Sequence, residues 1–135
     1  DEGETAVDAA LRELEEEVGL SCGQDQVLGL LDDFVTRSGY VITPVVVWAG
    51  PNRNLLMNPD EVESIHRIPM TELFRDDAPI IESIPESDRP VLRMPVADTS
   101  IAAPTAAMIY QFREVCLSGQ STRVAHFEQP VFAWH

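Results

Sequence analysis

The chain has 135 residues, enough for one domain, and 44% of them are hydrophobic. It carries 23 acidic residues against nine basic ones, all arginine, for a formal net charge of −14. This balance excludes binding to a nucleic-acid polymer through a broad basic face, and it argues against docking on an anionic membrane. No apolar run approaches the roughly 18 residues of a membrane span. Because the two cysteines make no disulfide framework, we expect a cytoplasmic protein.

The first predicted element is a helix over residues 5–18. Thr5 is of the type that caps a helix N-terminus, and Gly19 is of the type that ends one in the left-handed conformation. Between them, apolar residues recur at helical spacing and define one stripe. The stripe consists of Val7, Ala10, Leu11, Leu14 and Val18.

The remaining elements are mostly predicted strands. Residues 26–37 and 40–48 predict two strands around a turn at Ser38-Gly39, with Pro44 at an edge or a bulge because it cannot donate to a ladder. The elements that follow are a loop over 50–60, a strand over 61–67, a short helix over 70–75, strands near 79–84 and 90–95, a helix over 103–117, and a tail of β composition over 122–134.

The acidity is concentrated at the start of the chain. Residues 1–17 hold eight acidic residues and one arginine, a net −7, which is half of the total charge. On the predicted helix, Glu13, Glu16 and Glu17 stand at i, i+3 and i+4 and share one face. Two such charges about 6 Å apart repel by roughly 0.7 kcal/mol in water and about 3 kcal/mol at an effective dielectric near 20. A solvated acidic helix is one interpretation, and a site for a hard divalent cation, which removes the repulsion, is the other.

The order of these residues is more specific than their charge. Seven residues separate Glu4 from the run Arg12 to Leu20 (RELEEEVGL). From Glu4 onward, this order agrees at every position with the pattern G-x5-E-x7-R-E-U-x-E-E-x-G-U, where U is aliphatic. This pattern is the Nudix box, and the chain therefore resembles the Nudix hydrolase superfamily. The opening glycine of the box would fall before residue 1.

The resemblance implies an α+β fold of the Nudix type, an α/β/α sandwich with a mixed β-sheet. We expect residues 1–135 to be a single Nudix domain, its C-terminal portion, with a remnant of the box at 1–20 and the N-terminal strands missing from the chain. A sheet that lacks strands exposes its edges. We therefore expect the missing N-terminal half, or a second copy in a homodimer, to complete it.

The resemblance also implies the chemistry, which is metal-dependent hydrolysis of the diphosphate of a nucleoside diphosphate linked to another moiety. Carried over by position, Glu13, Glu16 and Glu17 are the ligands of Mg²⁺ or Mn²⁺, and Arg12 holds the carboxylates by ion pairing. Glu4 and Gly19 are structural. The base that activates water is Glu13 or a carboxylate outside the box, for which Glu61 ranks ahead of Glu63.

The substrate is less defined than the reaction. Residues 58–62 (NPDEV) and 68–70 (IPM) are similar to a segment of coenzyme A pyrophosphatase-like Nudix proteins. That likeness favours coenzyme A or its acyl derivatives as the small-molecule substrate. Residues 100–105 and 125–130 depart from the usual ending of this subgroup, so ADP-ribose or another nucleotide sugar stays open. A non-catalytic Nudix module that binds a nucleotide or a protein is the third hypothesis.

Overall fold

The computed structural model describes residues 3–51, 55–60 and 67–134. Its internal contacts divide the chain into two compact units. Unit 1 is Asp1–Leu30 with Val45–Arg67, and unit 2 is Leu31–Pro44 with Ile68–His135. That residues 1–135 form a single domain stays a prediction, and each unit is described by itself. No helix in the described ranges is both long and apolar enough to cross a bilayer.

Unit 1 begins with the predicted helix, α1 (Ala6–Val18). Thr5 caps it, with Oγ1 accepting the N–H of Asp8 at 3.1 Å. Gly19 ends it in the left-handed conformation at φ +71°, and its N–H donates to the carbonyl of Glu15 at 3.0 Å. Both predicted ends are therefore confirmed. The apolar stripe is only half-buried, and no residue of α1 is fully buried.

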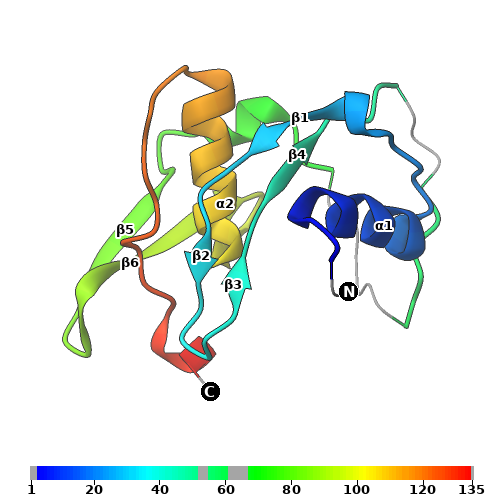
Figure 1. Ribbon diagram of the computed structural model, residues 1–135. Coiled ribbons are helices and arrows are strands. Elements are labelled where there is room, and N and C mark those ends of the chain that lie inside the picture. Colours follow the sequence, from blue (N-terminus) through cyan, green and yellow to red (C-terminus); the bar gives the residue numbers. More distant parts are fainter. Residues whose placement is uncertain (1–2, 52–54, 61–66, 135) are drawn as a thin grey trace. The chain divides into compact units, whose positions relative to one another are not determined.

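The same unit holds a two-stranded antiparallel sheet of β1 (Val27–Leu30) and β4 (Val45–Val47), which lie side by side in Figure 1. A short 3-10 turn, η1 (Gln24–Gln26), leads into β1. The backbone continues the pairing one step beyond the strands, because the N–H of Trp48 donates to the carbonyl of Gln26 at 2.8 Å.

The two long strands predicted over 26–37 and 40–48 are each broken in the middle. Two short strands near the turn, β2 (Phe34–Val35) and β3 (Val41–Ile42), pair with each other in unit 2. Pro44, predicted at an edge or a bulge, lies between β3 and β4, and its carbonyl accepts the N–H of Leu31 at 3.0 Å. Proline has no N–H to donate back to Leu31, so the two residues share a single hydrogen bond and the ladder stops there.

The larger sheet of unit 2 is antiparallel, in the order β5 (Ile80–Ile84), β6 (Ser87–Val96), β7 (Thr99–Ala102). β5 and β6 confirm the two strands predicted near 79–84 and 90–95. The sequence does not predict β7, because its four residues carry no alternation. It follows a two-residue turn in which Ala97 has φ +53°, a conformation unusual for a residue with a Cβ.

The helix predicted over 103–117 is present as α2 (Thr105–Phe112), continued by a π-helical turn, η3 (Arg113–Leu117). The short helix predicted over 70–75 is the 3-10 turn η2 (Met70–Phe74). These elements pack with β2 and β6 into the core of unit 2. The core consists of Phe34, Leu73, Leu92, Met94, Ala103, Ala106, Ala107, Val124 and Phe127.

The tail over 122–134 does not form the strand that its composition predicts. Its only described pairing is a single parallel bridge between Glu128 and Val91, and it ends in the 3-10 turn η4 (Val131–Trp134). Val124 and Phe127 enter the core at a spacing of three rather than two, and Pro130 cannot donate to a ladder. The mixture of helices and sheets confirms the α+β class. Within the described ranges the mixed character of the sheet is limited to this parallel bridge.

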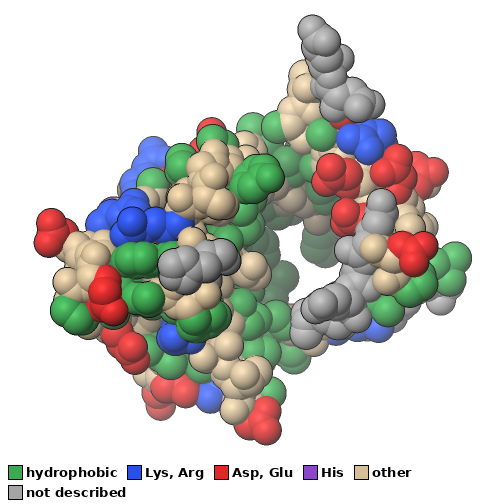
Figure 2. All heavy atoms as spheres, turned by 90° about the horizontal axis from the view of Figure 1, so that it is seen from below, with side chains coloured by type: hydrophobic (Ala, Val, Ile, Leu, Met, Phe, Trp, Pro, Cys, Tyr) green, Lys and Arg blue, Asp and Glu red, His purple; other side chains and the backbone are tan. Residues whose placement is uncertain are grey.

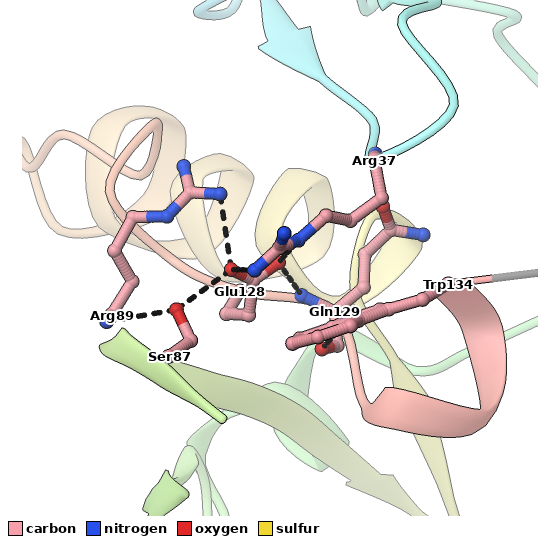
Figure 3. A network of polar contacts seen from close by, with 6 residues as sticks. All are labelled: Arg37, Ser87, Arg89, Glu128, Gln129 and Trp134. Atoms are coloured by element: carbon pink, nitrogen blue, oxygen red, sulfur yellow. Dashed lines mark hydrogen bonds and ion pairs between the residues drawn. The ribbon is translucent and has the colours of Figure 1, made fainter. Parts of the chain in front are cut away.

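A buried carboxylate fixes the tail of unit 2 (Figure 3). Glu128 is 1% exposed and accepts two hydrogen bonds from Arg37, at 3.1 and 2.8 Å. Arg89 and the hydroxyl of Ser87 donate to the same carboxylate at 3.0 and 2.9 Å. The N–H of Gln129 donates to Oε1 at 3.1 Å. Glu128 thus joins the β2–β3 turn, the start of β6 and the tail.

Trp134 completes this network from the other side of Arg37. The guanidinium carbon of Arg37 lies 3.8 Å from the centre of the Trp134 ring, a cation–π contact visible in Figure 3. The indole N–H of Trp134 donates to the carbonyl of Gln129 at 2.8 Å. Burial alone raises the pKa of Glu128, but the hydrogen bonds from Arg37, Ser87, Gln129 and Arg89 outweigh it and lower the pKa to about 2.

We expect Glu128→Gln to destabilise the protein by about 3 kcal/mol, because it leaves two guanidinium groups facing a neutral amide in a buried setting. The measurement is urea unfolding at pH 7. Glu82→Gln removes an exposed carboxylate on β5 and is the matched control, expected to change stability by less than about 0.5 kcal/mol. Equal effects of the two variants would contradict the assigned role of Glu128.

The same residue predicts acid sensitivity. The folded-state pKa of Glu128, about 2, lies below its ordinary value of 4.5, so its contribution to stability is complete above pH 4.5 and is lost as the pH falls toward 2. Urea midpoints measured from pH 6 to pH 2.5 should therefore fall more steeply for the parent protein than for Glu128→Gln. Parallel curves would mean that the carboxylate titrates normally.

Candidate functional site

The acidic face of α1 is the site that the sequence predicts. Figure 2 shows acidic side chains gathered on the part of the molecule that contains this helix. The side chains of Glu13 and Glu16 are 56% and 52% exposed, and Glu17 is half-buried. Because α1 is regular from Ala6 to Val18, the three carboxylates stand on consecutive turns of one surface.

Arg12 is the cation of this face. It binds Glu4 through two hydrogen bonds, Nε to Oε2 at 3.0 Å and an Nη to Oε1 at 3.1 Å. It also donates to Glu16 at 3.1 Å and stands 4.0 Å from Glu13. The hydrogen bonds from Arg12 are the largest cause that lowers the pKa of Glu4, and Glu4 in turn raises the pKa of Arg12. Glu4 therefore anchors the guanidinium, which reaches the box acids from a fixed position.

The oxygen donors of this face are of the type that Mg²⁺ and Mn²⁺ prefer. In the present side-chain conformations, no three acidic, histidine or cysteine side chains of the described ranges converge on a point where an ion could sit. Glu13 and Glu16 are solvent-exposed, so a change of rotamer is enough to turn them, with Glu16 exchanging its bond to Arg12 for the ion. The residues present fit a divalent cation by donor type.

A loop lies against the C-terminal end of α1, a feature that the sequence does not predict. The N–H of Leu56 donates to the carbonyl of Val18, and the N–H of Asn58 donates to the carbonyl of Glu17, both at 2.7 Å. A Cβ added at Gly19 would lie 3.1 Å from the Cβ of Leu56, closer than most side chains allow. The box glycine therefore serves both a left-handed turn and a close approach.

Two predicted residues cannot be placed. Glu61 and Glu63, the acids proposed outside the box as the base, lie outside the described residues. The described segment ends just before them, at Asp60, whose N–H donates to Oδ1 of Asn58 at 3.1 Å. The structure therefore brings together Glu4, Arg12, Glu13 and Glu16 at α1, and it leaves the assignment of the external base as a prediction.

Comparison with known proteins agrees with the box. The NUDIX domain family matches residues 1–91, two thirds of the chain, and the chain therefore belongs to that family. It is 35% identical over 79 residues to Nudix hydrolase 3 of Caenorhabditis elegans, covering 56% of this chain and 33% of that protein. It is 43% identical over 63 residues to the uncharacterized Nudix hydrolase NudL of Photorhabdus laumondii, covering 47% and 34%. The chain spans about a third of the length of these relatives.

Gly19→Ala should destabilise the protein by about 1–2 kcal/mol, because alanine resists the left-handed conformation and its Cβ presses on Leu56. Urea unfolding measures this loss. Gly29→Ala is the control, since Gly29 has open space around it and an ordinary φ. A loss at residue 19 no larger than at residue 29 would show that neither the turn nor the contact matters.

Proposed function

We propose that the protein containing this chain is a metal-dependent pyrophosphohydrolase. It cleaves the diphosphate of a nucleoside diphosphate linked to another moiety. Membership of the NUDIX domain family supports this proposal, as do the names of the relatives, which are called Nudix hydrolases. The observation that carries it is that Glu13, Glu16 and Glu17 lie on one face of α1, with Arg12 held beside them by Glu4.

In this proposal Glu13, Glu16 and Glu17 hold Mg²⁺ or Mn²⁺. When bound, such an ion neutralises phosphate charge and lowers the pKa of water. The acidic face repels a diphosphate on its own, so substrate binding and metal binding are coupled through charge. Arg12 is anchored by Glu4 and shares a hydrogen bond with Glu16, which holds the Glu16 carboxylate on this face until the ion replaces that bond.

The reaction itself is a displacement at phosphorus. A water oxygen forms the new P–O bond, and the bond from that phosphorus to the bridging oxygen breaks, so each product keeps one of the two phosphates of the diphosphate. The proton of the attacking water passes to a carboxylate. Glu13 and Glu61 are the residues proposed for this base, Glu61 because it closely follows the loop that contacts the end of α1.

We further propose coenzyme A or its acyl derivatives as the substrate, on the strength of the NPDEV segment at 58–62. ADP-ribose and other nucleotide sugars are the competing class. The products distinguish the two classes. Coenzyme A gives 3′,5′-ADP and a phosphopantetheine derivative, whereas ADP-ribose gives AMP and a sugar phosphate. A cytoplasmic location and a homodimer remain predictions.

Glu16→Gln in the full-length protein should lower Mg²⁺-dependent phosphate-anhydride cleavage by at least about a hundredfold, because the amide cannot replace a charged ligand. The assay follows product release from coenzyme A and from ADP-ribose. Glu15→Gln is the matched control, since Glu15 is the adjacent, exposed and variable position of the box. Its rate should stay within about twofold of the parent rate.

Three outcomes distinguish the hypotheses. Cleavage of coenzyme A alone supports the proposed substrate, and preferential cleavage of ADP-ribose replaces it with the competing class. Absence of cleavage from a broad nucleotide panel with Mg²⁺ and with Mn²⁺ would sink the enzyme proposal. Nucleotide binding without cleavage would then favour the non-catalytic module.

A further inference from the structure

The last turn of α1 depends on the loop over 55–60 for its hydrogen bonds. The final carbonyls of any helix lack partners within the helix. Here the amides of Leu56 and Asn58 satisfy the carbonyls of Val18 and Glu17, each at 2.7 Å. The two donors stand two residues apart, so both amides face the end of the helix.

Two further contacts set the loop in this position. Gly19 turns the chain at φ +71° and lets Leu56 approach so closely that a Cβ at residue 19 would lie 3.1 Å from the Leu56 Cβ. Oδ1 of Asn58 accepts the N–H of Asp60 at 3.1 Å, a local turn that fixes the backbone of Asn58. The Asn58 side chain therefore supports the amide that binds Glu17.

Among the described residues, the last turn of α1 is only partly buried. No residue of α1 is fully buried, and helix ends fray when tertiary contacts do not restrain them. Fraying of the last turn would displace both Glu16 and Glu17. In the described part of the chain, the two backbone hydrogen bonds from the loop act directly on the turn that carries the proposed metal ligands, together with the bond from Gly19 to the carbonyl of Glu15.

We propose that Leu56 and Asn58 are positioning residues for metal binding, acting through the backbone of Val18 and Glu17. Leu56 acts through its amide, and Asn58 acts through its amide and the side chain that orients it. The inference rests on the proposed function only in taking Glu16 and Glu17 as ligands. It extends the metal site beyond the box, to a loop about 40 residues further along the chain.

The test is Mn²⁺ binding by the full-length protein, measured by electron paramagnetic resonance with the metal alone. Leu56→Pro removes the amide that binds Val18, and Leu56→Ala keeps that amide and the Cβ. Asn58→Ala removes the acceptor for Asp60, and Asn58→Asp keeps it. We expect the Kd for Mn²⁺ to rise about tenfold in Leu56→Pro and Asn58→Ala, and to stay within about twofold in the conservative partners.

A second control separates positioning from general helix stability. Thr5→Ala removes the cap at the opposite end of α1 and leaves the loop untouched. It should lower the melting temperature at least as much as Asn58→Ala and leave Mn²⁺ affinity near the parent value. If Thr5→Ala weakens Mn²⁺ binding as much as Asn58→Ala does, the loop acts only through stability and the proposal is wrong.

The remaining outcomes separate this inference from the proposed function. Unchanged Mn²⁺ affinity in both Leu56→Pro and Asn58→Ala overturns the inference and leaves the proposed function intact. Weakened Mn²⁺ binding in these variants, in a protein that cleaves no nucleotide, supports the inference and overturns the proposed hydrolase. A parent protein that binds no Mn²⁺ overturns both.

Discussion

Repulsion among carboxylates is the constraint that organises this chain, which has 23 acidic residues and nine arginines to neutralise them. Cations are scarce, and one of them, Arg12, lies where several acids meet. Arg12 serves Glu4, Glu13 and Glu16 together on α1. The box helix keeps uncompensated charge on its exposed side, and in our proposal that surplus is what draws a divalent cation to this helix.

Glu128 shows the opposite arrangement, in which arginines outnumber the acid that they bind. The buried Glu128 receives two guanidinium groups from partly exposed arginines, so its charge is more than neutralised. Arg37 and Arg89 lie within the segment that matches the NUDIX domain, whereas Glu128 lies beyond it. The tail lies outside the matched segment, and the arginines that hold it lie inside that segment.

The sequence is informative wherever a side chain carries the structural signal. Thr5 and Gly19 fix the ends of α1 through local hydrogen bonding and backbone conformation, and both ends are predictable for that reason. The contact of Leu56 and Asn58 with the helix end is not predictable from the sequence, because backbone amides make this contact. Every residue except proline has a backbone amide N–H. The prediction for the tail is wrong because β-branched and aromatic residues also suit an irregular segment whose side chains enter a core. β7 is not predicted because its four residues show no alternation of apolar and polar side chains.

The ion pair of Arg37 and Glu128 spans 91 positions of sequence. Closing so long a loop is entropically costly, and such contacts form after local ones. During synthesis, Arg37, the β2–β3 turn and β6 all leave the ribosome before their common partner does. Unit 2 can complete its fold only when residue 128 has emerged. Termination of synthesis just short of that position would supply every core residue but leave Arg37 and Arg89 without the carboxylate that joins them.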